Sequence, residues 1–314
     1  MDKNNSETKE AHAKGADPSG GVRYLGLPEF IERMSPSRVV LAVCVLSLLA
    51  YANSLAGDFV FDDLDQVVGN RDIRSWSNVE RAFTTHLWSF RDRPEILRPA
   101  IPPPYYRPIF TVVLTAEYQM FGLWPQGWHL VSLLLHILCS IAVYYILLLI
   151  SKRNAVAALA AALFAIYPVH VESVSWISGI TDPLFGVFFL WSFYFYLRYR
   201  HGARWKHLTV SLLLFLVATF SKETALSLVA LVFIYELIES SCRGLADRPG
   251  ILTRLVGAAR YALPFAGVVM VYLIARYVAL GALTWKTGRT YEGPLIHTLY
   301  TLPYVVLTYL GHLL

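Results

Sequence analysis

The sequence predicts an all-α polytopic membrane protein, and three observations support this fold class. Of the 314 residues, 56% are hydrophobic and only 16% are charged, whereas soluble domains carry about 25% charged residues. Apolar stretches close to the length of a membrane-spanning helix recur along the chain. Aromatic residues make up 14% of the sequence, as expected where rings anchor helix ends at the membrane interface. This composition excludes a disordered chain, a disulfide scaffold and an ordinary cytosolic enzyme.

The first 37 residues are polar, so we expect a disordered cytoplasmic tail there. The first apolar stretch covers residues 38–56. The small residues Ala50 and Ala52 near its end match a signal-peptidase site, which makes cleavage an alternative. The polar leader is long for a signal peptide, and we therefore favour an uncleaved anchor.

A polar segment, residues 57–126, follows the first apolar stretch and contains acidic residues, arginines and consecutive prolines. Several of the later apolar stretches are shorter than the roughly 20 residues of a straight span, so their ends should extend into the flanking residues. These stretches lie at about 127–150, 155–168, 183–199, 207–220, 223–239, 261–281 and 295–314. Together with the first stretch they predict about eight transmembrane helices within a single domain, residues 38–314.

The interpretation of residues 108–123 decides the orientation of this bundle, because counting them as a span would reverse the membrane orientation of every later helix. Three alternate connections hold ten basic residues: Lys152, Arg153, Arg198, Arg200, Arg204, Lys206, Arg243, Arg248, Arg254 and Arg260. This positive-inside pattern puts the N-terminus in the cytoplasm only if 108–123 does not span. We therefore expect an interfacial helix there and an external loop over 57–126. Topology then explains the net charge of +5 without a nucleic-acid partner.

Adjacent carboxylates follow the first apolar stretch at Asp62 and Asp63. Such a pair beside a lipid surface is costly unless it is paired or solvated, and one member could serve as a general base. A solvated acidic turn is the alternative. Arg107 stands where the loop returns to the membrane, and a guanidinium at headgroup depth suits a phosphate, although it could only anchor a helix. Arg276, near the outer end of a later span, could snorkel to the interface.

Further polar residues interrupt the apolar stretches. His170, Glu172 and Asp182 could bind a sugar hydroxyl or a metal ion, or could form structural hydrogen bonds. A metal normally needs three or more protein ligands, and Asp182 is too distant in sequence to be assumed as the third, so we assign no metal ligand. Lys222 and Glu223 occupy a very short turn, where they could hold an anionic group or tie two helices together.

Six short segments occur in a distinctive order along the chain. They are NSLAGDFVFDD at 53–63, YRP at 106–108, GWHL at 127–130, FAIYPVHVE at 164–172, TD at 181–182 and SKE at 221–223. This order resembles the GT-C class of polytopic glycosyltransferases, and within it the transmembrane and tetratricopeptide-repeat O-mannosyltransferases and their bacterial relatives. The resemblance covers residues of about 38–314. The repeats that usually follow the membrane part in that family are absent here, so the chain could be truncated.

The resemblance implies an enzyme that moves a sugar, which we expect to be mannose, from a polyprenyl- or dolichyl-phosphate to a hydroxyl acceptor. The acceptor would be a protein Ser or Thr, or a glycan, on the non-cytoplasmic face. The reaction would invert the configuration at the anomeric carbon of the sugar. An acidic residue of the first external loop acts at the acceptor in that class, a position that Asp62 or Asp63 matches. We assign the donor phosphate to Arg107, Lys222 and Arg276, and the sugar and acceptor pocket to His170, Glu172, Asp182 and Glu223.

Cofactor and location are less determined by the resemblance. Metal dependence varies across the class, so no cofactor is assigned beyond the lipid-linked sugar substrate. We expect a bacterial inner membrane rather than an endoplasmic reticulum membrane. Two alternatives stay open: a flippase for a lipid-linked sugar, and a membrane scaffold without activity. Against the flippase, the charges cluster at one membrane face and no inverted repeat is visible.

Overall fold

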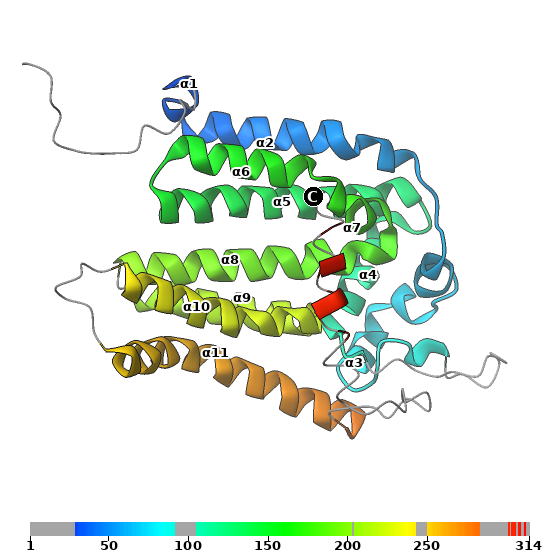
Figure 1. Cartoon of the computed structure of the whole chain (residues 1–314). Coiled ribbons are helices and arrows are strands. Elements are labelled where there is room, and N and C mark those ends of the chain that lie inside the picture. Colours follow the sequence, from blue (N-terminus) through cyan, green and yellow to red (C-terminus); the bar gives the residue numbers. More distant parts are fainter. Residues whose placement is uncertain are drawn as a thin grey trace, which may run out of the picture.

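The computed structural model describes residues 29–91, 105–202, 204–242 and 250–282, and isolated positions between 301 and 311. These residues are mostly helical and include no strand, which confirms the all-α fold class (Figure 1). Residues 1–28 of the expected tail, the proline run and most of the eighth apolar stretch, 295–314, lie outside the described residues.

Seven of the expected apolar stretches correspond to long helices. These are α2 (Pro36–Tyr51), α5 (Pro125–Ser151), α6 (Asn154–Ile166), α8 (Thr181–Gly202), α9 (Trp205–Ser221), α10 (Leu228–Ser241) and α11 (Ile251–Leu280). Within the described residues, five helical segments are long and apolar enough to cross a membrane. Helix α6 and the segment after it form a pair bent by 45°, and α9 is a shorter apolar helix. The chain is therefore a polytopic membrane protein.

Small and hydroxylated residues let these helices approach one another. Helix α6 turns its buried alanines, Ala157, Ala161 and Ala165 among them, toward α2 and α5. Between α8 and α9, the hydroxyl of Ser192 donates to the carbonyl of Ser211 at 2.7 Å, and the hydroxyl of Ser211 donates back at the same distance. Such close packing and reciprocal hydrogen bonds hold helices together where lipid gives no hydrophobic drive between them.

Shorter elements gather at one end of the bundle, namely α3 (Val79–Ala82), α4 (Pro108–Phe121) and α7 (Val171–Ser175), as Figure 1 shows. The last turns of α5, α8 and α10 and the first turns of α6, α9 and α11, which flank the three basic connections in the sequence, lie at the opposite end. Helix α4 covers most of the ambiguous stretch 108–123 and is not among the candidate spans of the described residues. We refer to the end with α3, α4 and α7 as the loop end.

Residues 29–35, at the end of the predicted tail, have a defined place. Helix α1 (Glu29–Glu32) lies beside the start of α6. The carboxylate of Glu32 accepts hydrogen bonds from the backbone nitrogens of Asn154, at 3.2 Å, and Ala155, at 2.8 Å. It thereby satisfies amides of the first turn of α6, which have no partner within that helix.

A buried ion pair crosses the end of the bundle opposite the loop end. Arg200 of α8 donates through Nε and Nη2 to the two carboxylate oxygens of Glu236 of α10, at 2.6 and 3.0 Å. Tyr196 donates to the same carboxylate at 2.5 Å. The hydroxyl of Tyr261 of α11 accepts from Arg200 Nη1 at 2.9 Å, and the guanidinium carbon lies 3.9 Å from the centroid of its ring. The pair therefore links three helices.

Glu117 of α4 gives the first testable prediction. It is 1% exposed, and neither carboxylate oxygen has a hydrogen-bond partner among the described residues. Burial raises its pKa well above the ordinary carboxyl value, since desolvation disfavours the charged form. The pKa of Glu117 is thus higher in the folded chain than in the unfolded chain. The free energy of unfolding is therefore highest below the unfolded pKa and decreases as pH rises from the unfolded toward the folded pKa.

We expect Glu117→Gln to stabilise the protein at neutral pH, by about 1–3 kcal/mol, and to leave it little changed at acidic pH. Thermal melting in detergent across pH 4–8 measures the effect. The exposed Glu80→Gln serves as the control and should show no such pH dependence. Parallel melting curves for Glu117→Gln and the parent chain at every pH would contradict the prediction.

Candidate functional site

A polar cavity of about 330 Å³ lies at the loop end of the bundle. Its wall combines the first loop, the start of α4, the connection from α7 to α8 and the turn between α9 and α10. Five of the predicted site residues line it: Asp62, Arg107, Glu172, Asp182 and Lys222. Residues from four distant parts of the sequence thus meet in one place.

The two adjacent aspartates have different environments. Asp63 is fully buried, and its Oδ1 accepts from the backbone nitrogen of Ser178 at 2.7 Å and from the Ser178 hydroxyl at 2.5 Å. Its Oδ2 accepts from the nitrogen of Val60 at 3.0 Å. Asp62 is half-buried, lines the cavity and makes no hydrogen bond or ion pair with another described residue. Asp63 fixes the loop to the segment before α8, whereas the Asp62 carboxylate at the cavity has no such structural partner among the described residues.

Backbone geometry explains why Asp62 faces the cavity. Phe61 has a φ of 49°, a left-handed conformation that residues other than glycine rarely adopt. Four residues earlier, the loop rests on the start of α5, where a Cβ at Gly57 would lie only 2.7 Å from Nε2 of His129. Glycine permits this close approach. The loop is thus held at Gly57 and at Asp63, on either side of Phe61 and Asp62.

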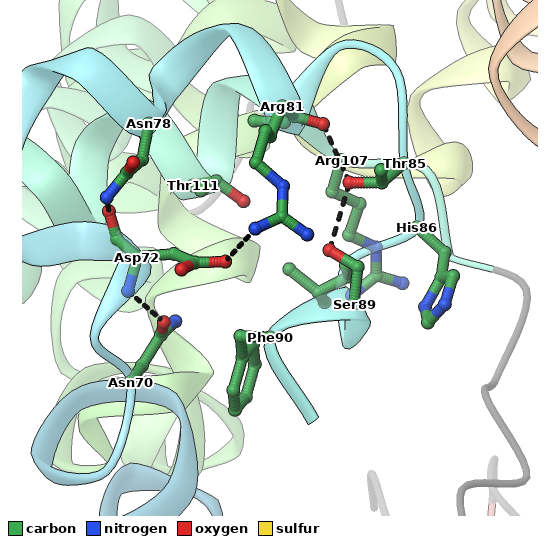
Figure 2. Close-up of a pocket in the computed structure, with 12 residues that line it drawn as sticks. Asn70, Asp72, Asn78, Arg81, Thr85, His86, Ser89, Phe90, Arg107 and Thr111 are labelled. Atoms are coloured by element: carbon green, nitrogen blue, oxygen red, sulfur yellow. Dashed lines mark hydrogen bonds and ion pairs between the residues drawn. The ribbon is translucent and has the colours of Figure 1, made fainter. Parts of the chain in front are cut away.

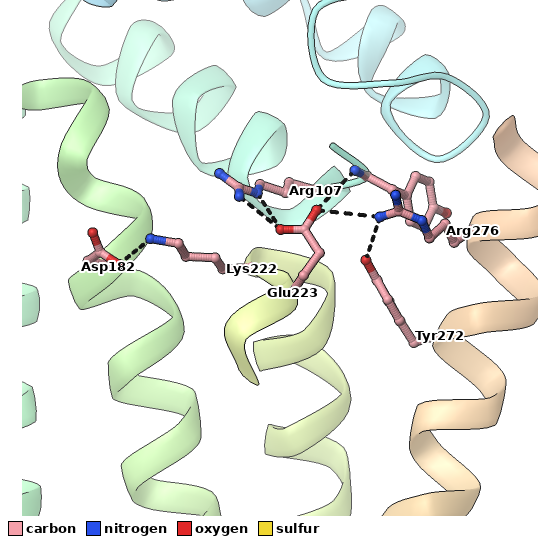
Figure 3. Close-up of polar contacts among 7 residues, drawn as sticks. Arg107, Asp182, Lys222, Glu223, Tyr272 and Arg276 are labelled. Atoms are coloured by element: carbon pink, nitrogen blue, oxygen red, sulfur yellow. Dashed lines mark hydrogen bonds and ion pairs between the residues drawn. The ribbon is translucent and has the colours of Figure 1, made fainter. Parts of the chain in front are cut away.

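The predicted phosphate-binding cations are all paired with carboxylates (Figure 3). Arg107 contacts one oxygen of Glu223 through Nε at 2.9 Å and Nη2 at 2.8 Å. The other oxygen of Glu223 lies 3.6 Å from Nη1 of Arg276. Lys222 pairs with Asp182. Among the described residues, these pairs bring together three cations and two carboxylates, a formal charge of +1.

Four predicted residues do not line the polar cavity: Asp63 and Glu223, described above, and Arg276 and His170. Arg276 is 9% exposed and donates to the hydroxyl of Tyr272 at 3.2 Å, and it supports Glu223 from α11. His170 lines a separate apolar groove of about 480 Å³, where its ring centroid lies 4.4 Å from that of Phe164. Asp182 lines both the cavity and this apolar groove, so the two spaces adjoin.

Three of the cavity residues that were not predicted from the sequence have unusual polar atoms. Gln66, Trp88 and Trp176 line the cavity, and each has a buried polar atom without a hydrogen-bond partner among the described residues: Oε1 of Gln66 and Nε1 of both tryptophans. Buried polar groups are normally satisfied. One acceptor and two donors suit a ligand that carries several hydroxyl groups. No motif distinguishes these residues, because isolated Trp and Gln in a loop are common.

Contacts among the residues around a small second pocket, of about 20 Å³, stabilise the first loop (Figure 2). Asp72 pairs with Arg81 at 3.5 Å, and its backbone carbonyl accepts from the side chain of Asn78 at 3.2 Å. The hydroxyl of Thr85 donates to the carbonyl of Arg81 at 2.7 Å. These contacts brace the segment that brings Trp88 to the cavity. In the described part of the chain, no three His, Cys, Asp or Glu side chains form a potential metal-binding group.

The fold and the cavity together define a polytopic α-helical membrane protein with a charge-lined cavity at one end of its bundle. Among curated proteins, the chain is similar to protein O-mannosyl-transferase TMTC3 of Mus musculus, with 29% identity over 203 residues, which are 63% of this chain and 21% of that protein. It is 30% identical to TMTC1 of Mus musculus over 207 residues, 62% of this chain and 21% of the relative. It is 28% identical to TMTC4 of Homo sapiens over 235 residues, 66% of this chain and 31% of the relative.

These similarities confirm the resemblance to the transmembrane and tetratricopeptide-repeat O-mannosyltransferases. The chain spans about a fifth of the length of TMTC3 and TMTC1 of Mus musculus. No protein-family profile matches the chain, and no solved structure matches it.

Proposed function

We propose that the chain forms the membrane part of a glycosyltransferase that moves mannose from a polyprenyl- or dolichyl-phosphate to a Ser or Thr hydroxyl of a protein. The observation that carries the proposal is the cavity at the loop end, where an unpartnered carboxylate at Asp62 shares one wall with the cations of Arg107 and Lys222. The names of the relatives support the mannosyl group and the protein acceptor.

In the proposed reaction, Asp62 accepts the proton of the acceptor hydroxyl as its oxygen bonds to the anomeric carbon of the sugar. A positioned base is needed because such a hydroxyl is a poor nucleophile at neutral pH. The bond from the anomeric carbon to the donor phosphate breaks, and the lipid phosphate leaves with the electron pair. Arg107 and Lys222 stabilise its charge. Attack on the side opposite the leaving group inverts the configuration at the anomeric carbon, as expected for the GT-C class.

The donor can be placed by its chemistry. Its isoprenoid tail is apolar and suits the groove lined by Phe164, Val169 and Phe185, whereas its phosphate suits the cations of the cavity. Asp182, which lines both spaces and pairs with Lys222, marks the junction. The sugar would then lie near Gln66 and Trp88, whose unpartnered polar atoms match hydroxyl groups. Glu172 also lines the cavity, and Glu223 holds Arg107 in place. His170 would border the isoprenoid tail rather than the sugar.

Orientation follows from charge. The helix ends that flank the basic connections lie at the end opposite the cavity, so the positive-inside rule would put the N-terminus in the cytoplasm and the cavity on the non-cytoplasmic face. The relatives named above are animal proteins and give no support to a bacterial inner membrane. We therefore propose a multi-pass membrane location without choosing between a bacterial and an endoplasmic reticulum membrane.

The proposal is tested with the purified chain in lipid nanodiscs, supplied with radiolabelled dolichyl-phosphate mannose and threonine-containing peptides. Formation of mannosylated peptide is the expected result. A flippase would instead move the donor across a liposome membrane without any acceptor, and a scaffold would do neither. Donor translocation without peptide labelling would therefore overturn the proposal.

Arg107→Ala should lower the transfer rate by about 10²–10³-fold, which is the usual effect of removing one group that stabilises developing negative charge. Arg107→Lys keeps the charge and should recover part of the rate. Arg33→Ala, at an exposed arginine directly after α1, is the matched control and should leave transfer unchanged. Steady-state rates with saturating peptide measure the effect, and an unchanged rate in Arg107→Ala would remove this residue from the donor site.

A further inference from the structure

An open groove of about 470 Å³ adjoins the polar cavity. It is lined by Val60, Phe61, Asp62, Val171, Glu172, Ser175 and Trp176. Asp62, Glu172 and Trp176 also line the cavity, so these three side chains form the wall between the two spaces. Whatever occupies the groove lies next to the carboxylate that we propose as the base.

The groove presents apolar surface to solvent. The side chain of Phe61 is 83% exposed and Val171 is 50% exposed, although both are large hydrophobic residues. Phe61 also has the left-handed backbone conformation described above, which costs about 1–3 kcal/mol in a residue other than glycine. An energetically unfavourable backbone that exposes an aromatic ring beside the proposed base indicates a binding role for that ring.

Charge and hydrogen bonding distinguish between two occupants, an acceptor peptide and a lipid surface. The carboxylates of Asp62 and Glu172, neither of which pairs with a described residue, would repel the anionic headgroups of a lipid surface. An extended peptide instead offers backbone N–H groups to carboxylates and carbonyls to donors. The buried indole nitrogen of Trp176, which has no hydrogen-bond partner among the described residues, is such a donor at the shared wall.

Resting on the proposed function, we infer that this groove binds an apolar side chain of the acceptor protein two residues from the Ser or Thr that receives the sugar. In an extended peptide, successive side chains point to opposite sides, so residues two apart share a face about 7 Å apart. When the hydroxyl enters the cavity at Asp62, the side chain two positions away faces the adjoining groove. The neighbouring residue faces away from the protein and is not selected.

The test uses the purified full chain in nanodiscs and fluorescent capped peptides that contain one threonine. Three peptides carry leucine two residues from the threonine, leucine next to it, or glutamine in both places. Without donor, the first peptide should bind about tenfold more tightly than the others, as expected for burial of one apolar side chain. Phe61→Ala should abolish this preference. Leu64→Ala, which removes a 54% exposed side chain from the same loop outside the groove, should preserve it.

With dolichyl-phosphate mannose present, the same preference should appear in the KM for peptide. Equal binding of the three peptides, or a preference that survives Phe61→Ala, overturns the inference. The binding experiment needs no transfer, so the two proposals fail separately. A preference without any mannosylation would retain the groove as a peptide site and reject the proposed enzyme activity. Mannosylation without a preference would retain the enzyme activity and reject the groove as a peptide site.

Discussion

Asp62→Asn is expected to lower mannosyl transfer by about 10²–10⁴-fold, the usual range for a general base, and to leave the melting temperature unchanged. The amide keeps the size of the carboxylate but cannot accept the hydroxyl proton. Stability should not change, because the Asp62 side chain is half-buried and has no partner among the described residues. Transfer to a threonine peptide and thermal melting of the same preparation measure both effects.

Two neighbouring variants make this experiment specific. Asp63→Asn weakens the hydrogen bonds to Ser178 and Val60, and should destabilise the protein by about 1.5–3 kcal/mol, as expected for bonds to a charged group. Glu172→Gln should keep most of the transfer rate, because Glu172 is proposed to shape the pocket. A large loss in Glu172→Gln together with an active Asp62→Asn would instead identify Glu172 as the base.

Glu236→Ala is expected to destabilise the protein by about 3–5 kcal/mol, because it leaves the guanidinium of Arg200, whose side chain is only 19% exposed, without its carboxylate partner. Glu236 is 5% exposed and also accepts from Tyr196, so α8, α10 and α11 lose a shared contact. Chemical unfolding in detergent measures the loss. The specific activity of the remaining folded protein should not change, since this pair lies at the end of the bundle opposite the cavity.

The control for Glu236 lies on the same helix. Glu239 is exposed, and Glu239→Ala should change stability by less than about 0.5 kcal/mol. Replacing both members of the pair, with Arg200→Met and Glu236→Leu, removes the unpaired charge and should restore much of the stability. If Glu236→Ala melts like the parent chain, the ion pair contributes nothing to holding the three helices together.

Much of the fold could be predicted from local sequence. Hydropathy located seven helices of the described residues, because a spanning segment must be apolar and must satisfy its own backbone hydrogen bonds. The interfacial assignment of 108–123 depended on charge counting, and α4 is correspondingly absent from the candidate spans of the described residues. The residues 29–35 were assigned to a tail because their partner, the first turn of α6, is about 120 residues away in sequence.

The candidate site was predictable only as a set of residue types. Asp62 and Asp63 cannot be separated by sequence, because nothing local reveals that Ser178, 115 residues later, binds one of them. Lys222 and Glu223 are also adjacent, yet Lys222 pairs with Asp182 and Glu223 with Arg107. Gln66, Trp88 and Trp176 escaped prediction because a polar atom becomes unusual only when the surrounding fold buries it without a partner.

The sequence by itself therefore determined that this chain is a helical membrane protein, where its helices run and which few charged residues could act at the loop end. Those properties depend on whether each segment by itself can enter lipid. The composition of that segment and the charges that flank it decide this, and both can be read from the local sequence. Only the tertiary structure decided which charges share the cavity and which are already neutralised. Hydrogen bonds and ion pairs act over a few ångströms, whereas partners such as Arg107 and Glu223 are 116 residues apart along the chain.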